Sequence, residues 1–226
     1  MLPFTHQQFV LVFSLYNGAI WPLQPIVHGA GLAMLVLLLR PSRARVVASV
    51  ALIALLWLWT GVIYQIGFFS RINPVALAFG AMFVVEGALL LEAACRGRLA
   101  FARAGTGTGG VRRAFGWTLL VYSVAVYPLL GALLGAGYFE SPPFGLTPCP
   151  LTLTTLGMLL IASPSVPHRL YVVPMAWALI GGSAAGLLRM PQDSVLLVTP
   201  IVLGLLAAYE RFKARAPAAT GKRGGV

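Results

Sequence analysis

Four stretches of this chain contain no Asp, Glu, Lys or Arg: residues 1–39, 46–70, 114–139 and 141–168. A helix that crosses the hydrocarbon core of a bilayer needs about 20 mostly apolar residues, and each stretch is long enough to supply one. Of the 226 residues, 59% are hydrophobic and only 9% are charged, whereas ordinary soluble domains carry about 25% charged residues. A soluble core cannot bury so much apolar surface. The chain is therefore predicted to be an all-α integral membrane protein.

The apolar segments predict a bundle of seven transmembrane helices, forming one domain over residues 22–210. Several segments have proline near their start, which is favourable because the first turn of a helix has no acceptor for the missing N–H. The predicted spans are about 22–39, 46–67, 74–95, 115–136, 148–163, 170–188 and 193–210.

Residues 1–21 predict an amphipathic helix that lies in the membrane interface. Thr5 can cap this helix, with Gln8 three residues on. An alternative is a short extra span, which gives eight spans and places the N-terminus inside. The predicted apolar face is Phe9, Val12, Phe13, Tyr16 and Ile20, and the predicted polar face is Gln7, Ser14 and Asn17.

Lys and Arg are distributed unevenly between the loops of this topology. Fourteen of the 16 lie in alternate loops and in a basic tail, residues 211–226, whereas the opposite loops hold only Arg71 and Arg189. Cytoplasmic loops of membrane proteins carry such an excess. The prediction is a bacterial inner-membrane protein with its N-terminus outside and its C-terminus in the cytoplasm. Topology thus explains the net charge of +11, and no nucleic-acid partner is predicted.

Glu86 lies near the middle of the third predicted span. A charged carboxylate at that depth costs on the order of 3 kcal/mol, so the side chain should face the bundle interior. Two interpretations stay open: a proton or cation site, or a neutral carboxyl group hydrogen-bonded to a neighbouring helix. His28, in the first span, can reach Glu86 only if the helices pack suitably, and a polar contact between helices is favoured over a metal site. Glu92 is predicted to pair with Arg96.

Polar residues gather at the predicted outer ends of the helices, where they could line an outward vestibule. Cys149 lies between two prolines at a helix start, which makes it a weak candidate for a soft-metal or redox site. No second cysteine or clear methionine partner accompanies it, so a packed thiol is favoured, and no cofactor is assigned. The candidate ion, proton or substrate-binding residues are Glu86, His28, Gln65, Asn73, Glu140, Cys149 and Asp193.

Two GxxxG patterns, Gly131 with Gly135 and Gly182 with Gly186, predict close helix packing. The glycine-rich loop 104–110 lacks the ending of a phosphate-binding loop, and the chain has no CxxC or HExxH motif. An enzyme is therefore not the favoured interpretation.

Short motifs also carry a resemblance to a known family. They are Pro3-Phe4-Thr5, Tyr16-Asn17 with Ile20-Trp21-Pro22, Ile72-Asn73-Pro74 with Phe79-Gly80, and Phe144-Gly145-Leu146-Thr147-Pro148-Cys149-Pro150. The chain resembles the domain-of-unknown-function 6064 family over nearly its whole length. The resemblance implies an uncharacterised, multi-pass bacterial membrane protein and supplies no activity.

Three functional hypotheses follow. The first is a transporter or channel for a small solute or ion, with Glu86 as its buried ionisable group and the vestibule as its entrance. The second is a non-catalytic or assembly subunit of a larger membrane complex, with a homo-oligomer or other membrane subunits as partners besides the lipid bilayer. The third and weaker hypothesis is a soft-metal or thiol redox protein that uses Cys149.

Overall fold

The computed structural model describes residues 3–101, 110–133, 137–162 and 166–215, except for the side chains of Ala132 and residues 213–215. All regular structure in these ranges is helical, apart from one isolated bridge between Phe101 and Ala162. The all-α prediction is thus confirmed for the described part of the chain. Most of the glycine-rich loop, Gly135 and the tail from residue 216 lie outside the described residues.

The described helices fall at the seven ranges predicted as spans and at the predicted N-terminal helix. Short segments of other helix types join some of the α-helices, so that Arg43–Arg71 and Gly110–Gly131 are each continuous helical stretches. The α-helices are α1 (His6–Ala19), α2 (Leu23–Leu39), α3 (Arg43–Trp59), α4 (Ala76–Cys95), α5 (Gly110–Val121), α6 (Tyr127–Leu133), α7 (Pro148–Ile161), α8 (Arg169–Ala184) and α9 (Ser194–Arg215). The π- and 3-10 segments are η1 (Thr60–Phe68), η2 (Phe69–Arg71), η3 (Tyr122–Val126), η4 (Tyr138–Glu140) and η5 (Pro191–Asp193).

Length and composition set which helices could cross a membrane alone. Within the described residues four stretches qualify: Arg43–Arg71, Ala76–Cys95, Gly110–Gly131 and Pro191–Phe212. The pair α1 and α2 qualifies only if it is taken as one span, and its two helices are bent by 87°. The structure therefore has four or five helical segments of spanning character, fewer than the seven predicted from apolar runs.

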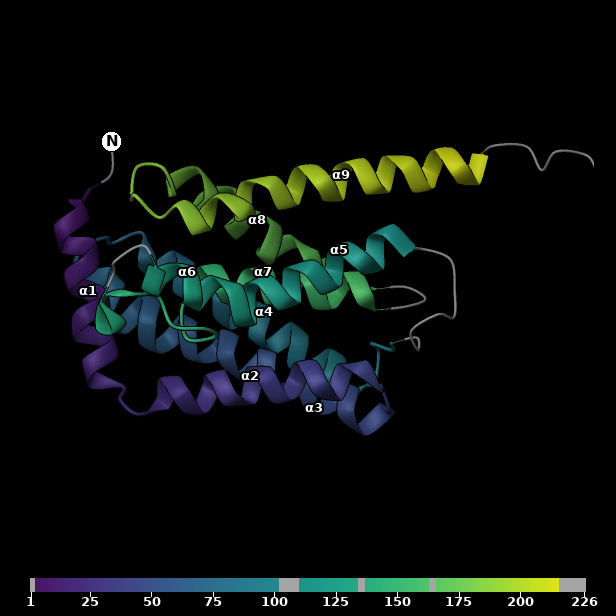
Figure 1. The fold of residues 1–226 in the computed structure, drawn as a ribbon, viewed down its shortest axis with the longest axis horizontal. Helices are drawn as coiled ribbons and strands as arrows, with labels where there is room; N and C mark the ends of the chain where they lie inside the picture. The colour runs from purple at the N-terminus through teal and green to yellow at the C-terminus, as the bar shows by residue number, and fades with distance from the viewer. Residues whose placement is uncertain (1–2, 102–109, 134–136, 163–165, 216–226) are drawn as a thin grey trace, which may run out of the picture.

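Helix α1 lies across the ends of the helices that form the bundle (Figure 1). It begins with the predicted capping box, in which Gln8 N–H donates to Thr5 Oγ1 at 3.2 Å and Thr5 N–H donates to Gln8 Oε1 at 2.8 Å. The prediction that Asn17 belongs to an exposed polar face of this helix was wrong. Its side chain is buried, and its Nδ2 donates to the carbonyl oxygens of Phe139 and Ser141 at 2.8 and 2.9 Å. These bonds tie α1 to the segment around η4.

Helix α7 is the central helix of the bundle. Every residue of α7 except Cys149 is buried, and α7 packs against α3, α5 and α8. At 14 residues it is about 21 Å long, shorter than the hydrocarbon core of roughly 30 Å. Protein rather than lipid would therefore surround α7 if the bundle lies in a membrane.

The residues that precede α7 are buried without being helical. The carbonyl oxygen of Leu146 accepts a hydrogen bond from the Tyr16 hydroxyl at 2.7 Å, and that of Pro143 accepts one from Thr147 Oγ1 at 2.8 Å. Trp59 Nε1 donates to the same Tyr16 oxygen at 2.9 Å. Buried backbone polar groups outside helices need hydrogen-bond partners from elsewhere in the protein. Helix α1 provides such a partner here through Tyr16, which in turn bonds to Trp59 of α3.

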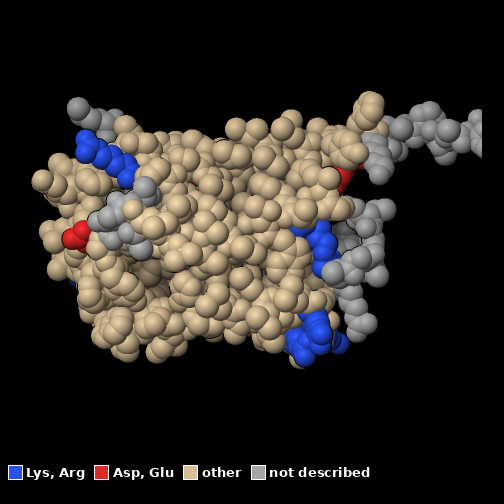
Figure 2. All heavy atoms as spheres, in the orientation of Figure 1, with Lys and Arg blue, Asp and Glu red and all other residues tan. Residues whose placement is uncertain are grey.

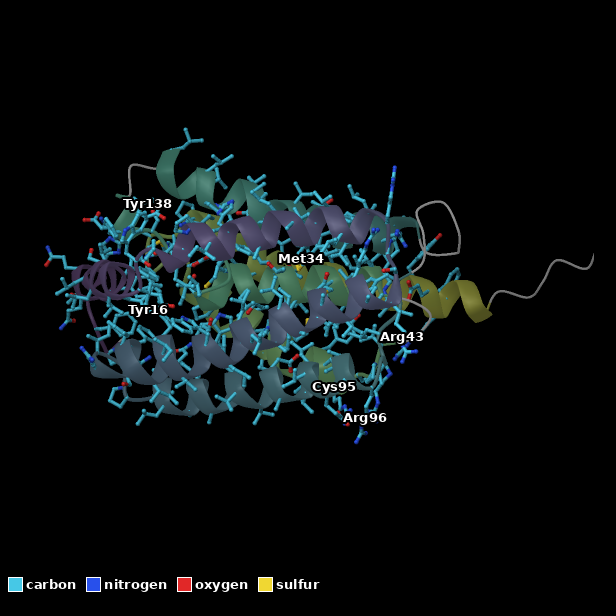
Figure 3. All side chains as sticks on the ribbon, turned by 90° about the horizontal axis from the view of Figure 1, so that it is seen from below. Tyr16, Met34, Arg43, Cys95, Arg96 and Tyr138 are labelled. Carbon is cyan, nitrogen blue, oxygen red and sulfur yellow. The ribbon has the colours of Figure 1, made fainter. Side chains whose placement is uncertain are left out.

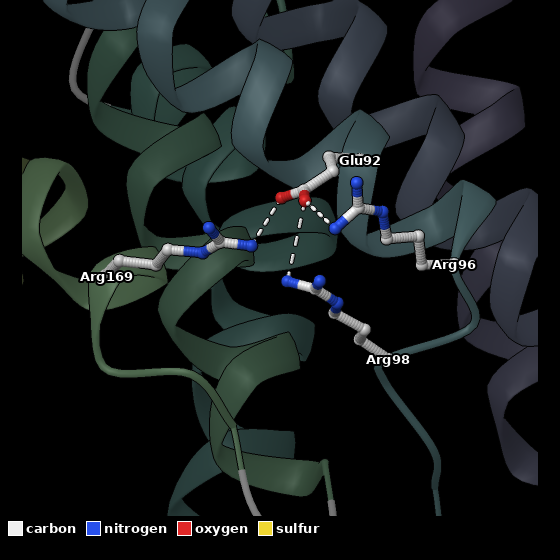
Figure 4. A network of polar contacts seen from close by, with 4 residues as sticks. All are labelled: Glu92, Arg96, Arg98 and Arg169. Carbon is white, nitrogen blue, oxygen red and sulfur yellow. Dashed lines mark hydrogen bonds and ion pairs between the residues drawn. The ribbon is translucent and has the colours of Figure 1, made fainter.

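Lys and Arg side chains lie at both ends of the bundle, and Figure 2 shows more of them at the right-hand end of the drawn face. Arg43, Cys95 and Arg96 lie at one end, which we call the basic end, and Tyr16 and Tyr138 lie at the other, the α1 end (Figure 3). At the basic end the predicted Glu92–Arg96 ion pair is confirmed at 2.6 Å (Figure 4). Glu92 also pairs with Arg98 at 3.5 Å and with Arg169. These contacts join the C-terminus of α4 to the N-terminus of α8.

Candidate functional site

A cavity of about 260 Å³ lies at the α1 end, and we call it the capped cavity because α1 forms one of its walls. Its other walls come from η1, η2, the first turns of α4, α6 and α7, and the end of α8 with the turn into η5. Segments far apart in the sequence thus meet around one space. Its polar lining includes Asn73, Tyr127, Cys149, Trp177 and Asp193.

Asp193 is the polar centre of the capped cavity. Its side chain is only 5% exposed, and its Oδ1 accepts a hydrogen bond from the Tyr127 hydroxyl at 2.6 Å. Tyr122 fixes the same turn, since its hydroxyl donates to the carbonyl oxygen of Gln192 at 2.8 Å. The Cys149 thiol lies beside Asp193 and Trp177. Two tyrosines from the α5–α6 helix therefore hold the start of α9 against the cavity.

Aromatic side chains form much of the apolar wall. Phe9 and Phe13 project from α1, and Phe13 stacks on Tyr64 with ring centroids 5.8 Å apart. Tyr64 in turn stacks on Phe69 at 5.9 Å. Trp177 Nε1 is buried and has no hydrogen-bond partner among the described residues. The cavity lining thus combines aromatic rings with an indole N–H beside the Cys149 thiol and one carboxyl group.

The N-terminus of α7 opens at this cavity, which is lined by Thr147, Pro148 and Cys149. Helix N-termini usually attract anions through their free backbone N–H groups. Here Pro148 and Pro150 remove two of those donors. This helix end is therefore a poor anion site, although α7 begins with the usual helical geometry.

Aromatic rings in edge-to-face and tilted contact run from the capped cavity to the turn of α4 that precedes Glu86. Phe79 lines the cavity and contacts Trp177 at 5.2 Å between ring centroids. Trp177 contacts Phe83 at 5.1 Å, and Phe83 contacts Trp57 at 4.3 Å. We call these four residues the aromatic stack. Glu86 follows Phe83 by one turn of α4, so it lies about 10 Å along the helix from Phe79.

Glu86 is fully buried, and neither of its carboxyl oxygens has a hydrogen-bond partner among the described residues. The hydrogen-bonded interpretation and a hydrogen bond to His28 are therefore not seen. His28 is half-buried on α2, where its ring lies 6.0 Å from the ring of Phe144. A buried polar group without a partner is costly, typically by 1–3 kcal/mol or more for a group that can ionise. The stability of the fold therefore does not explain why a glutamate is present at position 86.

The structure brings together three of the candidate residues, Asn73, Cys149 and Asp193, in the capped cavity. Gln65 is fully buried in η1, with both amide atoms unpartnered among the described residues, and is not part of the cavity lining. Glu140 is exposed in η4. Five residues were predicted to line an outward vestibule, and three of them line this cavity: the five are Gln65, Asn73, Glu140, Cys149 and Asp193.

The glycines predicted to pack helices lie in different surroundings. Gly182 lies against the backbone of α9, because a Cβ atom added there would be 2.7 Å from Leu197 N. One added to Gly131 would meet Ser141 Oγ at 3.2 Å, whereas Gly186 has nothing within 4 Å. Two other pairs of glycines approach each other closely instead: Gly116 of α5 with Gly157 of α7, and Gly61 of η1 with Gly80 of α4.

Sequence analysis does not find the roles of Tyr127 and Trp177. Tyrosine is common in the aromatic belt at the membrane interface, so the sequence position of Tyr127 favours the belt over a cavity. Trp177 carries a usable signal. It stands well inside the predicted span 170–188, away from the ends where belt residues gather, and that position favours an internal role.

A metal centre has little support in this geometry. No group of three His, Cys, Asp or Glu side chains that could hold an ion occurs in the part of the chain that the structure describes. Cys149 has one such neighbour, Asp193. Both cysteines are free thiols, Cys95 exposed and Cys149 partly so.

Comparison with known proteins identifies a family. The model of a family of unknown function (DUF6064) matches residues 6–218. No curated protein and no solved structure matches the chain.

Proposed function

Since the chain belongs to the DUF6064 family, whose function is unknown, we propose a role from its own geometry: it is a multi-pass membrane protein that binds a small solute in the capped cavity and transports it. One observation carries this proposal. Asn73, Cys149 and Asp193 come from three distant segments and line one cavity, and aromatic rings run from it to the turn of α4 that precedes an unpartnered Glu86.

The shape of α7 supports a transport role. Transporters commonly place their binding site where a helix is interrupted within the membrane, because the broken backbone lines the cavity. Here the short α7 follows a buried, non-helical segment and begins at the capped cavity. The aromatic stack lies between this cavity and the turn of α4 that precedes Glu86. This arrangement resembles the closed side of an alternating-access cycle.

For orientation we propose the bacterial inner membrane, with the α1 end outside and the basic end in the cytoplasm, on the strength of the arginine distribution. The exposed Cys95 at the basic end provides a native test. In a Cys149→Ser background, a membrane-impermeant maleimide is expected to label Cys95 only after permeabilisation. A cysteine in place of the exposed Glu140 should instead react in intact cells. The reverse pattern would invert the topology.

Glu86 is proposed as the ionisable group that couples solute movement to protons. In proteoliposomes loaded with a pH-sensitive dye, Glu86→Gln is expected to abolish solute-driven proton flux, measured against a panel of small amines, amino acids and sugars. Glu86→Met should have an equal or higher free energy of unfolding, by about 1 kcal/mol. The reason is that it removes a buried carboxyl group that has no hydrogen-bond partner among the described residues. Glu140→Gln, which changes an exposed carboxylate, is the matched control. Unchanged flux in Glu86→Gln would remove this residue from the mechanism.

A second candidate, a subunit of a larger membrane complex, is favoured by α9. Only 11% of the most apolar window of Pro191–Phe212 is buried within the chain. Ile201, Leu205 and Phe212 are 63%, 66% and 76% exposed. Such a helix has ample surface for a partner, as well as for lipid. Absence of flux from the purified chain, together with stable co-purification of another membrane protein, would favour this role over transport.

A further inference from the structure

The capped cavity contains one charged side chain among its lining residues, the carboxylate of Asp193. That group is 5% exposed, its hydrogen-bond partners are two neutral groups, the Tyr127 hydroxyl and the Cys149 thiol, and the ion pairs found among the described residues all involve Glu92 instead. Buried carboxylates are normally paired with a positive charge or neutralised. The described protein leaves this positive charge to be supplied from the cavity.

The walls around Asp193 suit the same sign of charge. Phe13, Tyr64, Phe79, Tyr127 and Trp177 all line the cavity. The faces of aromatic rings carry partial negative charge and attract alkylammonium and quaternary ammonium groups, more strongly where water is excluded. Sites that recognise quaternary ammonium ligands are commonly built from such rings.

Anions are disfavoured by the same lining. No Lys or Arg is among the lining residues, so a negative group would meet only the Asp193 carboxylate. The two prolines at the start of α7 withhold backbone N–H groups that could otherwise offset that repulsion. A neutral polar solute could form hydrogen bonds with Asn73, Trp177 and Asp193, but it would bring no positive charge to the carboxylate.

We propose that the capped cavity binds a small organic cation of the alkylammonium or quaternary ammonium class, with the Asp193 carboxylate as counter-ion and the aromatic rings around its head group. This rests on the proposed function and names its substrate class. The volume of about 260 Å³ limits the ligand to a small molecule, because pockets for drug-sized ligands begin near 300 Å³. Helix α1 would form one wall around the bound cation.

The test uses the full chain purified in mild detergent and three probes of nearly equal shape: choline, its uncharged carbon isostere dimethylbutanol, and the carboxylate dimethylbutyrate. Affinity is measured from the tryptophan fluorescence of a variant in which Trp21, Trp59 and Trp117 are replaced by phenylalanine, so that only Trp57 and Trp177 remain. A second measurement is the rate of alkylation of Cys149 inside the cavity. Choline is expected to bind at least roughly tenfold more tightly than either analogue and to slow alkylation of Cys149.

Asp193→Asn keeps an acceptor for Tyr127 and removes the charge, so it is expected to weaken choline binding roughly tenfold or more. Glu140→Gln, which removes an exposed carboxylate at the same end, should leave the affinity unchanged. Equal affinity for choline and dimethylbutanol, or unchanged choline affinity in Asp193→Asn, would overturn the cation assignment. Protection of Cys149 by the neutral or anionic probe alone would also overturn it, while leaving the cavity as a binding site. Protection by none of the three would count against both proposals.

Discussion

Replacing Trp57 with alanine is expected to lower the free energy of unfolding by about 4 kcal/mol, the range seen when a large buried aromatic is truncated. Trp57 is fully buried, its ring lies 4.3 Å from that of Phe83, and its Nε1 donates to Thr155 Oγ1 at 2.8 Å. The substitution therefore removes one end of the aromatic stack and the polar link between α3 and α7. Reversible unfolding in mixed micelles, followed by far-ultraviolet circular dichroism, measures the change.

Two variants make this experiment specific. Trp57→Phe retains ring contact with Phe83 and loses only the indole donor, so a loss of about 1 kcal/mol is expected. Trp21 is 55% exposed, and Trp21→Ala should change stability by about 1 kcal/mol or less. If Trp57→Ala cost no more than Trp21→Ala, the aromatic stack would not be part of the stable core.

The second large effect is expected at the crossing of α5 and α7. A Cβ atom at Gly157 would lie 2.8 Å from the Gly116 carbonyl oxygen and 3.0 Å from Leu120 Cγ. The nearer obstacle is backbone, so the helices must separate, and Gly157→Ala is expected to lower the free energy of unfolding by about 3 kcal/mol. Gly116→Ala meets the mirror-image obstacle, the Gly157 carbonyl oxygen at 2.9 Å, and should behave alike.

The control variant is expected to change the free energy of unfolding in the opposite direction or not at all. A Cβ atom added to Gly204 of α9 would meet nothing within 4 Å, and alanine is favoured over glycine in a helix by about 1 kcal/mol. Gly204→Ala is therefore expected to be neutral or stabilising in the same unfolding assay. A stabilising effect of Gly157→Ala would show that α5 and α7 do not approach each other as closely as described.

The positions of the helices could be predicted from the sequence because prolines or charged residues mark the ends of the apolar runs. For example, the predicted helix 148–163 corresponds to α7 (Pro148–Ile161) in the structure, and the predicted helix 74–95 corresponds to α4 (Ala76–Cys95). The surroundings of each helix could not be predicted. In a membrane protein both the lipid-facing and the protein-facing sides of a helix are apolar, so periodicity does not separate a central helix such as α7 from a peripheral one such as α9.

Asn17 shows the same limit at the level of one residue. Its polarity suggested a solvated face of α1, but buried carbonyl groups of a distant loop use its amide. The candidate site was recovered in part, since depth along the predicted helices placed Asn73, Cys149 and Asp193 at one end. Tyr127 and Trp177 required tertiary structure, because their contacts with this group depend on how α6 and α8 pack.

The enclosure of α7 has a consequence for how the chain is made. This helix leaves the ribosome before α8, yet α8 provides part of the surface that surrounds it and, through Trp177, part of the cavity wall. Until α8 and η5 are synthesised, the face of α7 that packs on α8 is uncovered, and the capped cavity lacks the walls that Trp177 and Asp193 provide. A nascent chain that stops short of Asp193 would therefore contain an incompletely covered α7. The capped cavity is completed only when the final third of the molecule has been translated.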